Sequence, residues 1–342
     1  MVVISKRKTF YSLSEELVEY LQRYGRGAEI PVVYDDMFHF SEAYPYVDPK
    51  GNETLWHTVV YPPHEMAELR PKLAQIYTRL KIGGERMATP EHLSVDRIDF
   101  GEFGNSKPFR VRITNQFNDN SDYFYVKRAD ASRVYGLEFE HIFSPNRINF
   151  LARDSTLIEE HIAGVPGDVF IRDYIGRDDL NEVRVAKEFV KFNERSFIRL
   201  LGDMRSVNYV IDATPDFEEV QYRVRPIDFD QQSYEGNIQV YLSQFFADNQ
   251  PVVQLVTRKL NEETIRQYQR EEQTIIARRR RVAQQRLDLL LHCMSMQELM
   301  LPEKFVELVN GLNEHHKTNV FNGCRSTGDL VRMHIDVVLS GL

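Results

Sequence analysis

An alternating stretch between residues 94 and 129 constrains the fold of this chain most strongly. Three short runs, 94–100, 108–115 and 122–129, alternate apolar and polar side chains, which is the period of a strand that buries one face. A turn containing glycines joins the first two runs, and Asn-Asp-Asn-Ser joins the last two. Connections this short join antiparallel neighbours, so the stretch predicts an antiparallel meander.

The sequence that follows the meander changes from strand to helix. Segment 131–143 has the helical period and ends before Ser144 and Pro145, and strand-like sequence returns at 148–164. The chain turns helical after residue 176, over 179–201, and helical patterns account for nearly everything beyond residue 238. We therefore expect an α+β fold in which an antiparallel sheet precedes a helical region.

The first 93 residues are expected to form a separate N-terminal α/β layer. A helix is expected over 12–24, where Ser12 and Glu15 form a capping-box pattern. Two short strands and a second helix follow, and Pro71 predicts that this second helix is kinked or begins near residue 71. The expected organisation is an extension over 1–93, a sheet lobe over 94–165 and a helical lobe over 166–342.

Composition and charge exclude several classes of protein. The chain has 342 residues, of which 42% are hydrophobic and 27% charged, as in globular proteins with a sizeable core. A formal net charge of -8 disfavours nucleic acid as a partner. Two cysteines provide neither a disulfide framework nor a zinc site. No apolar run has the length of a signal peptide or a membrane span, so we expect a cytoplasmic protein without a membrane partner.

Three polar residues form the pattern that carries chemistry. Asp203 and Asn208 are five residues apart in LGDMRSVN, and Asp228 follows in IDFD after two strand-like runs. Phosphoryl transfer from a nucleotide needs one carboxylate to orient or deprotonate the attacking hydroxyl. It also needs an amide and a second carboxylate to hold magnesium. Asp203 alone is equally explained as a turn or capping residue, so the interpretation depends on the motifs around it.

A lysine upstream completes the pattern. Lys127 ends an alternating strand, where it could neutralise nucleotide phosphates. An acidic residue on the next helix could hold this lysine, and the candidates are Glu138 and Glu140. Glu138 is preferred because Ile142, four residues later, supplies an inward apolar contact. Asp230 is open to two interpretations, as a supporting group for the metal ligands or as an exposed acid.

These residues resemble the protein-kinase-like fold, and in particular its aminoglycoside phosphotransferase branch. In that family a catalytic loop of the type H-G-D-x-x-x-x-N precedes an I-D-[WF]-[DE] metal motif, and LGDMRSVN and IDFD follow in the same order. The resemblance covers about residues 94–240. It implies a two-lobed fold, ATP and Mg²⁺ as cofactors, and transfer of a phosphate to an alcohol group. A small-molecule acceptor is favoured over a protein acceptor, and the sequence does not identify it.

The resemblance also implies a role for each motif residue. Asp203 would be the catalytic base, Asn208 and Asp228 the magnesium ligands, and Lys127 the phosphate-binding lysine. It implies further nucleotide contacts from Tyr125 stacked on adenine, from the backbone of His161 and Ile162, and from the turn bearing Gly101 and Gly104.

The catalytic loop departs from the family pattern. Leu201 replaces the usual histidine, and Met204 and Arg205 stand where phosphotransferases commonly have Leu and His. Arg205 is expected to contact the transferred phosphate, as a lysine does in protein kinases. No A-P-E-type activation segment follows Asp228, which disfavours a conventional protein kinase. These departures support a second hypothesis, a pseudokinase that acts as a nucleotide-binding or protein-interaction module.

A third hypothesis is a helical scaffold that acts through the arginine run 278–281. Four consecutive arginines point around most of a helical turn, so a solvated, salt-bridged helix is expected instead of a partner surface. His315 and His316 are adjacent and are expected on the surface. We find no charge pattern beyond residue 238 that selects an acceptor.

Overall fold

The computed structural model describes residues 8–49, 51–82, 92–217 and 219–342, and they divide between two compact units. The sheet unit comprises Lys8–Ala131 and Ile148–His161. The helical unit contains Ser132–Arg147 and Ile162–Leu342. Each unit is therefore discontinuous in sequence, because a segment of the helical unit interrupts the sheet unit.

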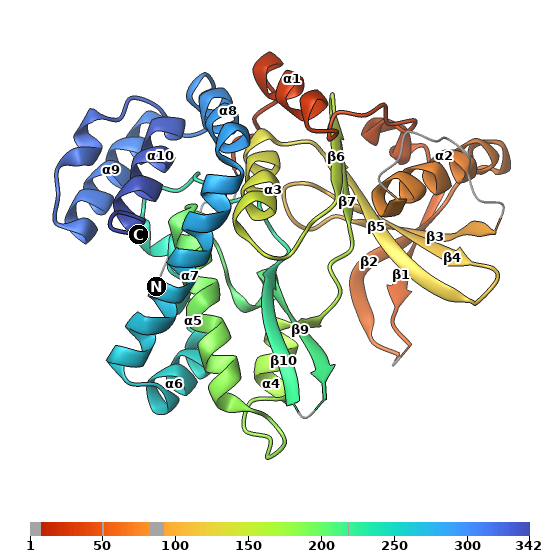
Figure 1. Ribbon diagram of the computed structural model, residues 1–342. Coiled ribbons are helices and arrows are strands. Elements are labelled where there is room, and N and C mark those ends of the chain that lie inside the picture. Colours follow the sequence, from red (N-terminus) through yellow and green to blue (C-terminus); the bar gives the residue numbers. More distant parts are fainter. Residues whose placement is uncertain (1–7, 50, 83–91, 218) are drawn as a thin grey trace. The chain divides into compact units, whose positions relative to one another are not determined.

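The sheet unit is built on a seven-stranded antiparallel sheet with the order β1-β2-β3-β4-β5-β7-β6 (Figure 1). The strands are β1 (Glu42–Val47), β2 (Glu53–Val60), β3 (Leu93–Gly101), β4 (Phe109–Asn115), β5 (Asn120–Arg128), β6 (Phe150–Arg153) and β7 (Thr156–Glu160). Strands β3, β4 and β5 pair as consecutive antiparallel neighbours. The predicted meander is confirmed.

The expected boundary near residue 93 does not separate two layers. Strand β2 pairs with β3, with Trp56 opposite Gly101 and Thr58 opposite Asp99. Strands β1 and β2 thus extend the same sheet, and the proposed N-terminal extension shares its core with the meander. The sequence pattern could not show this, because β2 and β3 are separated by more than thirty residues and their pairing is a long-range contact.

Helices α1 (Glu15–Arg23) and α2 (Pro63–Ile82) belong to the sheet unit. They differ from the prediction in the N-cap of the first helix and in where the second begins. The N-cap of α1 is Ser14, whose Oγ accepts a hydrogen bond from the Leu17 amide at 3.2 Å, and not the expected Ser12. Pro71 lies inside α2, which continues through it. The apolar side chains that follow Pro71 on α2 are buried in the core of the sheet unit, and this packing offsets the lost backbone hydrogen bond.

The helical unit confirms the expected change of structure along the chain. Its helices are α3 (Ala131–Phe143), which begins at the unit border, α4 (Gly167–Asp173), α5 (Glu182–Ile198), α6 (Gln250–Lys259), α7 (Glu262–Val282), α8 (Gln284–Ser295), α9 (Pro302–His316) and α10 (Thr327–Val338). A small sheet with the order β10-β9-β8 is formed by β8 (Val165–Pro166), β9 (Tyr209–Asp216) and β10 (Glu219–Pro226). The fold is α+β. None of the helices described combines the length and the apolar composition that crossing a bilayer requires.

Two surface expectations for the helical unit need correction. Arg279 is half-buried, and its guanidinium donates to the carbonyls of Ile142 and His141 at the end of α3. Arg280 forms an ion pair with Asp336, so the arginine run is partly used within the chain. His316 is half-buried, because its ring packs against neighbouring aromatic rings.

Candidate functional site

Asp203 lies in the loop between α5 and β9, with a backbone φ of 60°. An aspartate rarely adopts this left-handed conformation outside turns and functional sites. Backbone hydrogen bonds hold the loop on both sides of it, from the Gly202 amide to the Gln231 carbonyl at 3.1 Å and from the Asp203 amide to the Val240 carbonyl at 3.0 Å. The position of the Asp203 side chain is thus set by the surrounding backbone.

The Asp203 carboxylate is buried and carries one close cation. Arg205 donates to it through two nitrogens, with Nε 2.6 Å from Oδ1 and Nη2 2.9 Å from Oδ2. Burial raises the pKa of Asp203 to about 6, Arg205 opposes this shift, and the negative charge of Asp228 adds to it. The carboxylate is therefore ionised at neutral pH but accepts a proton more readily than an exposed aspartate.

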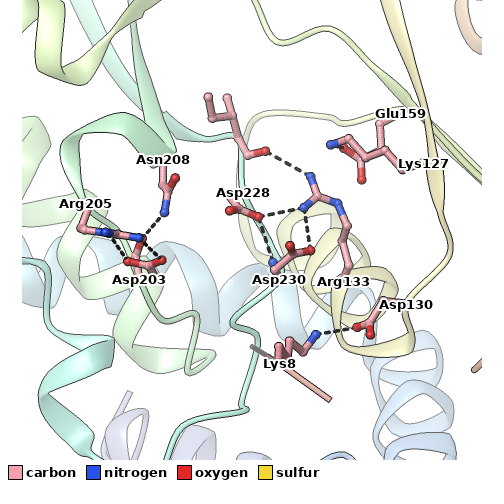
Figure 2. Close-up of polar contacts among 11 residues, drawn as sticks. Lys8, Lys127, Asp130, Arg133, Glu159, Asp203, Arg205, Asn208, Asp228 and Asp230 are labelled. Carbon is pink, nitrogen blue, oxygen red and sulfur yellow. Dashed lines mark hydrogen bonds and ion pairs between the residues drawn. The ribbon is translucent and has the colours of Figure 1, made fainter. Parts of the chain in front are cut away.

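Asn208 connects the two acids. Its Nδ2 donates to the Asp203 backbone carbonyl at 2.7 Å (Figure 2). The backbone carbonyl of Asn208 accepts from the Ile227 amide at 2.9 Å. Since Ile227 directly precedes Asp228, the strand that ends in IDFD is fixed beside the D-x-x-x-x-N loop. The structure thus brings together Asp203, Asn208 and Asp228.

The pattern analysis missed Arg133, which lies on α3. One of its nitrogens, Nη1, donates to Asp228 Oδ1 and to Asp230 Oδ1, both at 2.8 Å (Figure 2). The Arg133 side chain is only 3% exposed, whereas that of Asp228 is 35% exposed. Asp230 is buried with Arg133, so it is not an exposed acid, and its role as a supporting group for metal ligands stays a prediction. An arginine on an apolar helix face was the available signal, since a buried guanidinium needs carboxylate partners.

Residues 248 and 249, which follow the IDFD motif, also hold the Asp203 loop in place, and the sequence patterns did not indicate them. Asp248 Oδ2 accepts from the Ser206 amide at 2.7 Å and from its hydroxyl at 2.5 Å. Asn249 Nδ2 donates to the Met204 carbonyl at 2.9 Å. These residues lie about forty positions after the loop, and no spacing rule connects them to it.

In the sheet unit, the carboxylate beside Lys127 is that of Glu159. Lys127 Nζ lies 2.6 Å from Glu159 Oε2, and both side chains are buried. The two residues are diagonal neighbours on paired strands, because Tyr125 is opposite Glu159 in the register of β5 and β7. Strand register thus supplies an acidic partner for Lys127 within the sheet unit.

The expected glutamate partners of Lys127 on α3 are held within the helical unit. Glu138 accepts hydrogen bonds from Arg286 on α8, with Nε 2.9 Å and Nη2 2.8 Å from the two carboxylate oxygens. Glu140 forms an ion pair with the buried Arg199. These arginine pairs do not test the preference for Glu138 over Glu140 as the residue that positions Lys127, which stays a prediction.

The other nucleotide positions implied by the resemblance lie at the ends of the sheet strands. Tyr125 faces the same side of β5 as Lys127, as expected, with Lys127 Nζ 5.2 Å from the ring centre. The Tyr125 hydroxyl lies 3.1 Å from His161 Nδ1. The His161 amide already donates to the Tyr123 carbonyl at 3.3 Å, and the border between the two units falls between His161 and Ile162.

The turn between β3 and β4 contains the two expected glycines, each with a local structural reason. A Cβ at Gly101 would meet the Phe103 ring at 2.7 Å, and that ring packs edge-on against Trp56. Gly104 has a φ of 74°, which favours glycine. Local packing at Gly101 and the backbone conformation at Gly104 account for both residues without a ligand.

Comparisons with known proteins do not assign the chain to a family. No protein-family model matches it, and no curated protein matches it significantly.

Within the described ranges, no group of three or more His, Cys, Asp or Glu residues is arranged to hold a metal ion. The oxygens of Asn208 and Asp228 are nevertheless hard ligands of the kind that Mg²⁺ accepts together with substrate phosphates.

Proposed function

We propose that this protein is an ATP- and Mg²⁺-dependent phosphotransferase of the protein-kinase-like type, and that it phosphorylates a hydroxyl of a small molecule. The observation that carries the proposal is the Asp203 loop. It combines a buried carboxylate in a left-handed backbone conformation with an asparagine bound to its carbonyl and with Asp228 beside that asparagine. A capping or turn aspartate does not require the other two residues.

Asp203 would act as the general base. The acceptor oxygen attacks the γ-phosphorus of ATP, the bond from that phosphorus to the bridging β–γ oxygen breaks, and ADP leaves. The proton of the acceptor hydroxyl passes to an Asp203 oxygen and then to solvent. A pKa of about 6 suits this role, because the group is ionised at neutral pH and still basic enough to accept the proton.

Asn208 and Asp228 would hold magnesium, which supplies neutralisation of the phosphate charge when bound. The Asn208 amide nitrogen is used on the Asp203 carbonyl, and this orients its side-chain oxygen for another partner. The Asp228 side chain is about one-third exposed, so a ligand can reach it. In the sheet unit, Lys127 would bind phosphate, with Glu159 fixing its position.

One observation favours the second hypothesis, a pseudokinase. The Arg133 guanidinium already neutralises Asp228, and a cation in that position competes with a metal ion for the carboxylate. Under this hypothesis Arg133, Asp228 and Asp230 form a structural ion cluster, and nucleotide binding would not depend on magnesium.

Calorimetric titration of ATP with and without Mg²⁺ separates the two hypotheses. We expect binding that depends on magnesium, loss of this dependence in Asp228→Asn, and its retention in Asp203→Asn. Asp212→Asn on β9 is the matched control for a nearby acid outside the site. Binding that ignores magnesium, together with no ADP release in the presence of alcohol acceptors, would support the pseudokinase. No ATP binding under either condition would remove both hypotheses.

A further inference from the structure

The helical unit contains a cavity of about 570 Å³ that the proposed phosphotransfer does not use. Helices α5, α6, α7 and α10 line it, together with the end of α9 and the segment 242–244. This volume lies within the range of cavities that hold small organic ligands. The described lining residues include none of the three candidate catalytic and metal positions, Asp203, Asn208 and Asp228.

The wall of the cavity is about half apolar, and the charged residue among its described polar residues is Glu194. This residue is only 7% exposed. Gln269 and Gln273 of α7 donate their side-chain amides to its two oxygens, at 3.2 and 2.7 Å. The described lining residues include no lysine or arginine. A carboxylate held by neutral amides alone lacks the opposite charge that usually accompanies a buried acid.

Among the described residues that line the cavity, the two histidines do not supply that charge. Burial raises the pKa of Glu194, and the nearby Glu272 adds to the shift. His315 and His316 line the cavity, but burial lowers the pKa of both, that of His316 to about 4. Both rings are therefore neutral at pH 7.

We propose that this cavity binds a small organic ammonium ion with an apolar body, whose nitrogen lies against Glu194. The carboxylate supplies the opposite charge, and Phe189 and Phe197 contribute apolar surface to the wall. The aliphatic side chains of α6 and α10 accommodate the apolar body. An anionic ligand is disfavoured, because Glu194 would repel it.

The wall segment also connects the cavity with the Asp203 loop. Leu242 and Gln244 line the cavity. The adjoining Val240 carbonyl accepts the Asp203 amide, and Asn249 Nδ2 donates to the carbonyls of both Met204 and Ser243. A ligand that orders the segment 240–249 therefore also restrains the loop.

Three probes with one apolar body test the binding. Adamantylmethylammonium, adamantylmethanol and adamantanecarboxylate differ only in charge and hydrogen bonding, and calorimetry measures their affinities for the full chain in the absence of ATP. We expect the ammonium to bind about tenfold more tightly than the alcohol, a difference of about 1.4 kcal/mol, and the carboxylate to bind most weakly. Equal affinities, a preference for the carboxylate, or no binding of any probe would overturn the proposal.

Two variants locate the binding. Glu194→Gln should remove the preference for the ammonium over the alcohol while leaving the affinity for the alcohol. Val253→Trp, at a half-buried wall position, should fill the cavity and abolish binding of both. If the ammonium binds Val253→Trp as tightly as the wild type, its site lies elsewhere and the proposal fails. The probe series on the wild type remains decisive if a variant does not fold.

Hydrogen exchange tests the connection to the loop. The ammonium should slow amide exchange in residues 200–210 and 238–249, and the β3–β4 hairpin of the sheet unit serves as the internal control. Binding without protection in 200–210 would overturn the coupling. None of these measurements requires catalysis, so their failure is distinguishable from failure of the proposed phosphotransfer.

Discussion

Two buried aspartates, Asp99 in the sheet unit and Asp203 in the helical unit, differ in the groups that surround their carboxylates. Asp99 lies within β3 and accepts hydrogen bonds from Thr58 on β2 and Arg110 on β4, at 2.8 and 2.7 Å. Arg97 on the same strand also donates to it. Regular strand pairing thus brings donors from both neighbouring strands to Asp99.

Asp203 is a loop residue outside regular structure, and its backbone conformation is left-handed. Its ion-pair partner among the described residues, Arg205, is half-exposed. Burial raises its pKa to about 6, so it retains an unfavourable charge in the folded state at neutral pH. Two buried acids can therefore differ in how fully the surrounding groups compensate their charge. We propose that this difference separates Asp99, a structural acid, from Asp203, the candidate base.

The largest effect is expected from Asp203→Asn. Loss of the base should reduce turnover by about 1,000-fold, as is typical for a general base. The folded protein should become more stable at pH 8, because the charge cost of Asp203 is present above its pKa of about 6 and declines towards pH 4. Turnover assays and thermal unfolding at pH 5 and pH 8 measure both effects. Lower stability at pH 8 would place Asp203 with Asp99 as a structural acid.

Asp99→Asn should show the opposite behaviour. Removing a buried charge that two arginines surround should lower the free energy of unfolding by about 3 kcal/mol. Turnover per folded molecule should not change. Asp96→Asn, an exposed acid on the same strand, is the control and should have little effect. Denaturant titration measures the difference, and a stability equal to that of the control would contradict the structural role of Asp99.

Lys127 tests whether the sheet unit has a functional charge of its own. Lys127→Ala should weaken ATP binding by about 1.5–3 kcal/mol, as expected for hydrogen bonds to charged groups, and should weaken adenosine binding less. It should also destabilise the fold, because Glu159 loses its cation. The double variant Lys127→Ala with Glu159→Gln should regain stability but not ATP affinity. Recovery of both would show that the pair is structural only.

The smallest effect on turnover at neutral pH is expected from Arg205→Gln. Its guanidinium lowers the pKa of Asp203 against the effect of burial, so Arg205→Gln should raise that pKa. The acid limb of the turnover profile should move to higher pH, with a modest loss at pH 8. Arg205→Lys, which keeps the charge, should move it less. A profile that shifts to lower pH, or not at all, would contradict the assigned pairing.

The sequence predicted local structure better than long-range contacts. Alternation and short turns were sufficient for β3, β4 and β5, because both signals are local. The joining of β2 to β3 could not be predicted, since pairing across a helix has no signature in either strand. For the same reason, the division into 1–93, 94–165 and 166–342 differs from the observed units.

The candidate site, like the fold, was predicted only in part from the sequence. The grouping of Asp203, Asn208 and Asp228 followed from motif order, and the structure places these residues together. Their roles, and the roles of ATP and Mg²⁺, remain predictions. Glu159 was not predicted as a partner of Lys127, because helical spacing cannot reveal the register of β5 and β7. The assignment of a partner on α3 stays a prediction.

The interruption of the sheet unit by α3 has a consequence for synthesis on the ribosome. Residues 8–161 emerge first and contain all the strands of the seven-stranded sheet, which can pair early. Glu138 and Glu140 emerge with them, but their arginine partners are residues 286 and 199. Arg199 follows early in the remaining chain, whereas Arg286 is made only after more than half of it, so the ion pair between Glu138 and Arg286 forms late in translation.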